Sequence, residues 1–376
     1  MNKNKEKIAG YKEVFTYFLG LGFFGFGGPL ALVGNIQKDL VEKRQWIEEE
    51  DFNVIFSLIK AMPGPVSFQI AIFMGRHRAG FFGAVLAAIG VTAPAFFLMI
   101  VFSIFYQSLS HLPTVHLILQ GMQVTALGVI LGSLKALVKT NMKDLFFWVL
   151  IIFSGAINLV NPSIEPLIIL SFGLLIILLR KWQRESSTTL MSIAVPVAIF
   201  SSTMKDLALV CFKAGALVFG TGFAIVPMLQ HDVVDKYHWL SQNEFIDALA
   251  FGQMTPGPVV ITATYIGHNL AGMPGAFVAT IAIFAAAFFH MTTWFPYLIS
   301  RLKGKKWIND FTFGSVAAVV GPIIVAVLKM GVGIPLDIFL ISLAIIAFIL
   351  TFSNKVPMWL LILMGGIFNY LFRLIF

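Results

Sequence analysis

Residues 61–68 read Ala-Met-Pro-Gly-Pro-Val-Ser-Phe inside a long apolar stretch, and residues 254–261 read Met-Thr-Pro-Gly-Pro-Val-Val-Ile inside another. Proline lacks an amide donor and clashes with the carbonyl four residues before it, so Pro-Gly-Pro breaks a helix. A broken backbone within an apolar segment is tolerated only where protein or a water-filled cavity satisfies the freed groups. These two breaks therefore decide how the rest of the chain is interpreted.

Both breaks belong to a duplication. The series Phe26-Gly27-Gly28, Trp46 and Pro63-Gly64-Pro65 recurs 193 positions later as Phe219-Gly220-Thr221, Trp239 and Pro256-Gly257-Pro258. Over residues 22–66, fifteen of 45 positions are identical at this offset, against a chance level of roughly one in fifteen for such a composition. Further matches continue at an offset of 192. We therefore divide the chain into an N-terminal repeat (1–185), a connector helix (186–206) and a C-terminal repeat (207–376).

The composition is that of a membrane protein. Of the 376 residues, 58% are hydrophobic and only 12% are charged, whereas a soluble domain carries about 25% charged residues. The net charge of +8 is explained by basic loops beside apolar segments, so the lipid bilayer is the expected partner and no nucleic acid is needed. The single cysteine, Cys211, excludes an intrachain disulfide and a thiolate metal cluster. We expect an all-α polytopic fold without a cofactor.

The apolar runs predict about 12 to 13 membrane segments: 14–36, 52–75, 81–107, 117–138, 145–160, 166–180, 188–204, 207–229, 244–267, 273–299, 312–330, 336–352 and 356–375. Seven segments before the second copy would make the repeats inverted. Loop charges favour this, because Arg76 and Arg78 have no basic counterparts in the second copy. The N-terminus is then cytoplasmic. The loop 37–51, with Lys38, Lys43 and Arg44 on the predicted outer side, disagrees with the rule and is interpreted as an interfacial helix.

Paired helix breaks in two inverted halves are the best sequence indication of a transporter's binding site. Each half-helix restarts at a proline, and its free amides and positive dipole end can hold an anion. The alternative is that both motifs only kink helices for packing. The predicted binding residues near the breaks are Gly27, Gly28, Pro63, Gly64, Pro65, Val66, Ser67, Gln69, Gly220, Thr221, Gly222, Gln253, Thr255, Pro256, Gly257, Pro258 and Val259.

Cations inside apolar segments add to this candidate site. Lys60 and Lys213 could neutralise an anion, although snorkelling to the interface is the alternative for both. Arg76 and Arg78 could form a cytoplasmic basic funnel, and retention by the positive-inside rule explains them equally well. His290 could serve a proton relay, but it has no evident carboxylate partner in the sequence.

Motifs of enzymes are missing from the sequence. There is no His-Glu-x-x-His, Gly-x-Ser-x-Gly or Walker loop. A transporter without an ATPase is therefore expected, and a non-transporting membrane scaffold is the alternative from another class. For oligomeric state, Gly128-x-x-x-Gly132 is a weak helix-pairing motif, and a homodimer follows only from base rates.

The motifs Phe-Gly-Gly-Pro (26–29), Val41-Glu42-Lys43-Arg44-Gln45-Trp46, Pro-Gly-Pro (63–65) and Gly-Arg-His-Arg-Ala-Gly (75–80), with their echo in the second half, resemble the chromate transporter (CHR) family, long two-domain type. The resemblance implies potential-driven or proton-driven chromate export across the plasma membrane and chromate resistance, with sulfate or another oxyanion as the alternative substrate. Two departures, Thr221 in place of a glycine and Ala286 opposite Pro94, make the halves unequal.

Overall fold

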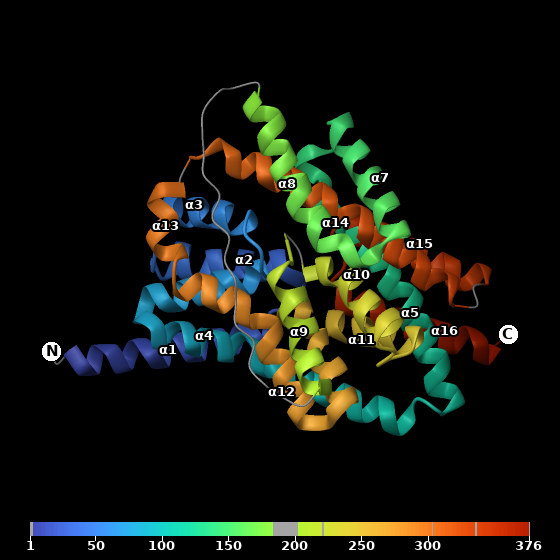
Figure 1. Cartoon of the computed structure of the whole chain (residues 1–376). Coiled ribbons are helices and arrows are strands. Elements are labelled where there is room, and N and C mark those ends of the chain that lie inside the picture. Colours follow the sequence, from blue (N-terminus) through green and yellow to red (C-terminus); the bar gives the residue numbers. More distant parts are fainter. Residues whose placement is uncertain (1–2, 183–201, 220–221, 303, 335–336, 376) are drawn as a thin grey trace.

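A computed structural model describes residues 3–182, 202–219, 222–302, 304–334 and 337–375, and every element within these ranges is helical (Figure 1). The fold is therefore all-α, as the sequence predicted. Gly220, Thr221 and most of the predicted connector (186–206) lie outside the described residues. Within the described ranges, six helices are long and apolar enough to cross a membrane, and two shorter apolar helices accompany them.

The first repeat begins with two helix pairs, each interrupted by a break. Its elements in chain order are α1 (Lys3–Phe24), α2 (Gly28–Ile36), η1 (Gln37–Lys43), α3 (Glu49–Lys60) and the start of α4 (Val66–Leu109). The first pair returns to the side on which it began, because Arg44, just after η1, contacts Glu13 of α1 at 3.4 Å. The second pair also returns, because Trp46 and Asp51 share a pocket with His77. Both pairs are re-entrant hairpins.

The long helix α4 consists of two helices joined at Ala79 and Gly80, whose backbone dihedrals are not helical. The chain reverses there, since Gly75 and Gly83 pack backbone against backbone. The second part then continues through a full span to Leu109. Close packing of this kind requires residues without side chains, which explains the glycines on both sides of the turn.

The rest of the first repeat consists of longer antiparallel helices. They are α5 (Pro113–Ser133), α6 (Lys135–Val138), η2 (Lys139–Asn141), α7 (Leu145–Val160), η3 (Pro162–Ile164) and α8 (Glu165–Trp182). Asp144 caps the N-terminus of α7, because its carboxylate accepts hydrogen bonds from the amides of Phe146 and Phe147. A side chain at this position satisfies donors that the helix itself cannot.

The second repeat reproduces this order. Its elements are α9 (Ser202–Ala216), η4 (Gly222–Ala224), α10 (Ile225–Leu229), η5 (Gln230–Lys236), α11 (Gln242–Met254), η6 (Val259–Ile261), α12 (Thr262–Thr292), α13 (Phe295–Leu302), α14 (Lys306–Val332), α15 (Ile338–Phe352) and α16 (Met358–Ile375). The reversal inside α12 lies at Ala271 and Gly272, 192 positions after that in α4. Their dihedrals match closely, so the duplication extends to the backbone.

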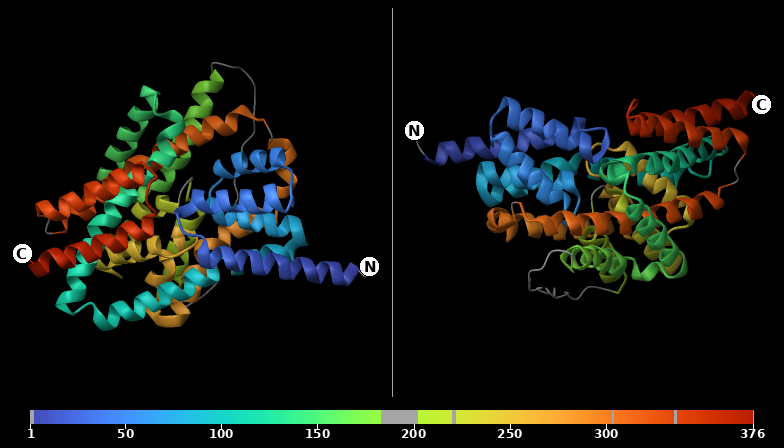
Figure 2. Two further views of the ribbon diagram at one scale, coloured as in Figure 1. Left: turned by 180° about the vertical axis from the view of Figure 1, so that it is seen from behind. Right: turned by 90° about the horizontal axis from the view of Figure 1, so that it is seen from above.

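The two repeats run in opposite directions. Glu13 contacts Arg78 at one end of the molecule, beside the turn of α4. The corresponding turn of α12 lies at the far end of α4, where Gln107 donates to Asn269 at 2.9 Å. We call these ends the N-terminal face and the C-terminal face, after the chain termini that lie at opposite ends in Figures 1 and 2.

This arrangement corrects four of the predicted membrane segments. The runs 14–36, 52–75, 207–229 and 244–267 are long enough to cross, but each contains a break after which the chain returns. The loop 37–51 therefore lies on the N-terminal face with Arg78, not on the opposite side. Its basic residues no longer disagree with the positive-inside rule.

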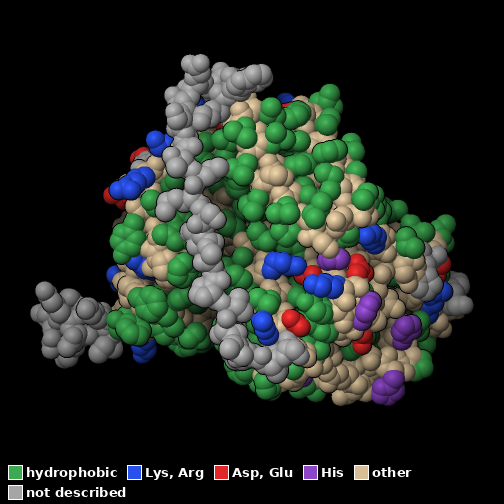
Figure 3. All heavy atoms as spheres, viewed as in Figure 1, with side chains coloured by type: hydrophobic (Ala, Val, Ile, Leu, Met, Phe, Trp, Pro, Cys, Tyr) green, Lys and Arg blue, Asp and Glu red, His purple; other side chains and the backbone are tan. Residues whose placement is uncertain are grey.

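Small residues hold the helices together. Gly128 and Gly132 of α5 pack against the backbone of α15 at Ala344 and Phe348. The Gly128-x-x-x-Gly132 motif, which suggested helix pairing between two chains, thus packs two helices of the same chain together. Figure 3 shows hydrophobic side chains over much of the visible face, as expected for a surface that contacts lipid.

Candidate functional site

Each Pro-Gly-Pro break contacts the first hairpin of the opposite repeat, at the point where the chain leaves α1 or α9. The Gly64 amide donates to the Val218 carbonyl at 2.6 Å, and the Gly257 amide donates to the Gly25 carbonyl at 3.3 Å. Both pairs are related by the 193-residue offset of the duplication. Each repeat therefore satisfies a backbone group that the break in the other repeat leaves free, as apolar surroundings require.

Glycine is required at both of these positions. Gly64 has φ +127° and Gly257 has φ +107°, a region that side chains strongly disfavour. A Cβ on Gly64 would also stand 2.5 Å from the Gln69 Nε2 atom, and one on Gly257 would stand 3.2 Å from the Val91 carbonyl oxygen. The breaks are therefore close approaches of backbone as well as turns.

Each break is followed by a helix start that no side chain caps. The first half of α4 begins after Pro65, η6 begins after Pro258, and neither proline contributes a side-chain hydrogen bond. Neither first turn contains an acidic residue. The amides of Val66 and Val259 thus lie at the positive ends of two helices, which is the arrangement that favours an anion.

Polar side chains near the breaks differ in what they can still bind. The hydroxyls of Thr255 and Thr262 donate to local carbonyls. The Gln69 amide donates to the Pro63 carbonyl at 2.7 Å, and the Gln253 amide donates to the Leu249 carbonyl. The buried Ser67 hydroxyl has no partner. Among the polar candidates from the sequence, Ser67 therefore keeps an uncommitted donor for an oxyanion.

The glycines of the first hairpins take different places. Gly27 and Gly28 have positive φ angles at the start of α2, where the chain turns back. Gly222 begins η4, and a Cβ there would stand 3.3 Å from Val259 Cβ. Gly222 thus contacts the second break directly, whereas Gly28 faces Met358 of α16.

The two candidate lysines have different surroundings. Lys60, at the end of α3, is exposed and its Nζ lies 4.0 Å from the centre of the Phe56 ring. Lys213 forms an ion pair with the buried Asp232 of η5. Asp232 thus compensates part of the charge that Lys213 would offer to an anion.

The predicted basic funnel lies on the N-terminal face. Arg78 donates twice to the Glu13 carboxylate, at 3.0 and 2.8 Å. Arg76 lies over the Tyr297 ring at 5.8 Å. Because Glu13 offsets the charge of Arg78, Arg76 is the more available of the two for an incoming anion.

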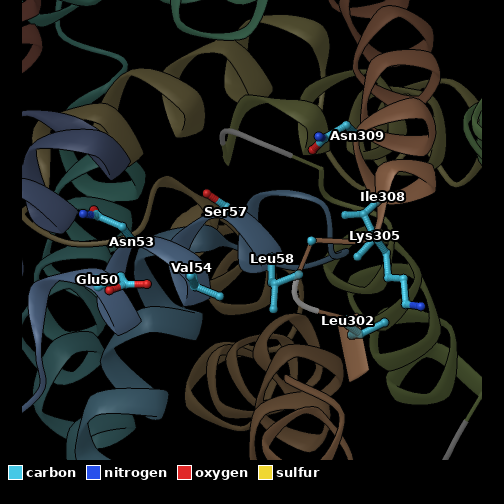
Figure 4. A pocket seen from close by; sticks show the side chains of 10 residues that line it. Glu50, Asn53, Val54, Ser57, Leu58, Leu302, Lys305, Ile308 and Asn309 are labelled. Carbon is cyan, nitrogen blue, oxygen red and sulfur yellow. The ribbon is translucent and has the colours of Figure 1, made fainter. Parts of the chain in front are cut away.

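The sequence analysis missed a cavity of about 420 Å³ on the N-terminal face. It lies between α3, which contributes Asn53 and Ser57, and the segment around α14, which contributes Lys305 and Asn309 (Figure 4). Residues 50, 53, 57 and 60 are all polar and recur at helical spacing in α3. This stripe leads from the surface cavity to Lys60, three residues before the first break.

The corresponding helix of the second repeat is closed. Every residue of α11 from Phe245 to Gln253 is buried, and α11 packs on α5 and α16. Asp247, 1% exposed, accepts a hydrogen bond from the Gln123 amide at 3.0 Å. Asp247 could have been identified from the sequence, because it is a carboxylate within the predicted apolar segment 244–267. Among the described residues, α3 therefore borders an open cavity on the N-terminal face, whereas its counterpart α11 is packed on all sides over residues 245–253.

His290 contacts the first break from the second repeat. It interacts with the Pro63 backbone, and its ring lies 5.3 Å from that of Trp294. Its Nδ1 atom has no hydrogen-bond partner. Within the ranges that the structure describes, no carboxylate forms an ion pair with it, so it links the repeats without forming a relay dyad.

Two inverted repeats whose paired helix breaks meet between them define a membrane transport protein of the inverted-repeat class. The family model described as chromate transporter matches residues 12–178 and 205–370. The chain belongs to the chromate transporter family and is not an enzyme.

Relatives are similar over nearly the whole chain. A probable chromate transport protein of Synechococcus elongatus is 33% identical over 376 residues, covering 96% of this chain and 95% of the relative. A chromate transport protein of Cupriavidus metallidurans is 33% identical over 360 residues, covering 91% and 88%. An uncharacterised transporter of Methanocaldococcus jannaschii is 26% identical over 382 residues, covering 96% and 94%. No solved structure matches the chain.

Proposed function

We propose that this protein exports chromate from the cytoplasm by alternating access around the two Pro-Gly-Pro breaks, and that it confers chromate resistance. The observation that carries the proposal is the reciprocal pair of hydrogen bonds at Gly64 and Gly257, which brings two uncapped helix starts together. Two positive helix ends suit a tetrahedral dianion. The family supplies the identity of the substrate.

The N-terminal face is the cytoplasmic one in this proposal. Arg44, Arg76 and Arg78 lie there, and Arg180 pairs with Asp310 at the same end. Basic residues are retained on the cytoplasmic side of a plasma or inner membrane. The cavity along α3 is then an inward-facing vestibule, in which Lys60 and Arg76 attract the anion.

Export needs no nucleotide hydrolysis. Moving a dianion out of an inside-negative compartment is favoured by roughly 4.6 kcal/mol per 100 mV. The cavity at α3 and the burial of α11 support a cycle in which the two helices open in turn, α3 toward the inner side and α11 toward the outer side. In the opposite state α11 would separate from α5 and the α3 cavity would close.

The test is uptake of labelled chromate into inside-out vesicles, with sulfate as competitor. Chromate and sulfate are near isosteres that a polar cage separates poorly, so sulfate is the alternative substrate and competition measures the preference. Chromate accumulation that depends on an imposed potential supports the proposal. No flux of either anion at any potential would indicate a membrane scaffold instead. Cross-linking in the same vesicles tests for a homodimer.

A further inference from the structure

Glu165, the first residue of α8, is buried without a hydrogen bond. Its side chain is 1% exposed, and neither carboxylate oxygen has a partner. A carboxylate buried without donors is costly, whereas the protonated carboxyl group is neutral. The residue was not among the candidates from the sequence, because it lies at the edge of the predicted segment 166–180.

The surroundings of Glu165 come from the second repeat. Lys213 of α9 and Asp232 of η5 form an ion pair, and both are within electrostatic reach of Glu165. The other titratable groups around this trio are Cys211 on α9 and His231 and Asp235 on η5. His231 bonds Ser163 at 2.9 Å, next to the trio. Figure 3 shows acidic, basic and histidine side chains gathered over α9 and α10.

The charges of the trio favour a proton as its ligand. With both carboxylates ionised, the single ammonium of Lys213 leaves one negative charge in a buried place, and one proton removes it. A metal ion would need more ligands than two carboxylates and would face the ammonium. Among the described residues there is no group of three His, Cys, Asp or Glu that could hold one.

The trio is connected to the first break. Helix α9 carries Lys213, and the Val218 carbonyl just beyond its end accepts from the Gly64 amide. Gly215 packs directly on the Ile283 backbone of α12, so a shift of α9 moves both elements. Protonation of Glu165 removes its attraction for Lys213 and thus changes what holds α9 in place.

The first repeat lacks this arrangement. The residue 193 positions before Lys213 is Gly20, and the one before Asp232 is Asp39. Asp39 pairs with Lys43 at 2.8 Å; Lys43 is exposed to solvent and Asp39 is partly exposed. The corresponding surface of the first repeat therefore has an ion pair without a buried third carboxylate.

We propose that Glu165 binds a proton at the C-terminal face and couples its entry to the exit of the oxyanion. Glu165 is within electrostatic reach of Lys213 and Asp232 and begins α8, whose other end carries Arg180 at the N-terminal face, so the length of this helix separates the trio from that face. This inference rests on the proposed function. It makes the protein an exchanger of protons against the oxyanion, rather than a carrier driven by potential alone.

The test uses inside-out vesicles whose potential is clamped at zero with potassium and valinomycin. At one-to-one coupling, an interior more acidic by one pH unit should raise steady-state accumulation of labelled chromate about tenfold in the wild type. Glu165→Gln should abolish this response and retain flux driven by an imposed potential. Asp39→Asn is the matched control and should keep the full response. If Glu165→Gln does not fold, Glu165→Asp should shift the pH midpoint of the response.

A second readout does not depend on flux. Chromate added to weakly buffered, detergent-purified protein should release a proton from the wild type, and Glu165→Gln should bind chromate without release. A tenfold pH response in Glu165→Gln, or loss of its potential-driven flux at equal folded amounts, would overturn the assignment. Wild-type protein that moves chromate without any pH response would also overturn it. Wild-type protein that moves no chromate would instead refute the proposed function.

Discussion

Replacing Gly64 with alanine tests whether the first break is fixed by close backbone contact. Alanine would have to hold φ near +127°, which costs about 1–3 kcal/mol. Its Cβ would stand 2.5 Å from Gln69 Nε2 and 3.0 Å from Ala287 Cβ. Moving the Gln69 amide would break its hydrogen bond to Pro63, worth about 0.5–1.5 kcal/mol. The expected loss in the free energy of unfolding is about 1.5–4.5 kcal/mol.

The matched control is Gly34→Ala. Gly34 lies in the interior of α2, and a Cβ there would meet no atom within 4 Å. Alanine is favoured over glycine in a helix by roughly 0.5–1 kcal/mol, so this variant should be neutral or slightly more stable. Both variants introduce the same methyl group into the same repeat. A difference between them therefore reports the local geometry and not the added apolar surface.

The assay is thermal unfolding in detergent, followed by size-exclusion chromatography, together with chromate flux in vesicles at equal folded amounts. Gly64→Ala should lower Tm by about 2–6 °C and reduce flux, while Gly34→Ala should leave both unchanged. Equal melting temperatures with full flux in both variants would refute the geometry given to the first break.

Three further predictions concern other parts of the molecule. Lys60→Gln should raise KM for chromate from the N-terminal face about two- to fivefold without lowering Tm, as measured by flux, because one exposed charge contributes little. Gly215→Ala should cost about 3 kcal/mol or more and remove the folded peak in chromatography, since its Cβ would overlap the Ile283 carbonyl. Glu42→Cys and Asp235→Cys, 193 positions apart and both exposed, should react with an impermeant maleimide from opposite sides; labelling from one side would contradict the inversion.

The sequence predicted the features that depend on residue identity at fixed spacing. The duplication and the paired breaks followed from residues such as Pro63 and Pro256, the inversion followed from the number of apolar segments and the loop charges, and the family resemblance was confirmed. Hydropathy, however, reports only the length of an apolar run. It could not show that 14–36 turns back at its break, because a returning hairpin and a full span contain the same kind of residues. The sign of the error in the sequence was the group of basic residues Lys38, Lys43 and Arg44 on the predicted outer side.

The buried carboxylates were missed for a related reason. Asp247 and Glu165 each stand alone in the sequence, while their partners Gln123 and Lys213 are separated from them by many residues. Spacing rules find groups on one helix, and these groups assemble only when helices from both repeats pack. The polar stripe of α3 was accessible from the sequence, since its members recur at helical spacing.

The reciprocal hydrogen bonds also determine how long after its own synthesis a break can reach its native partner. Gly25 is made 232 residues before Gly257, the donor to its carbonyl. At a synthesis rate of about 5–20 residues per second, the donor to the Gly25 carbonyl is made roughly 12–46 s after Gly25. Throughout that interval the break in the first repeat lacks its native hydrogen-bond donor. Slowing translation after residue 185 should therefore prolong its exposure to proteases, whereas slowing translation before residue 25 should not.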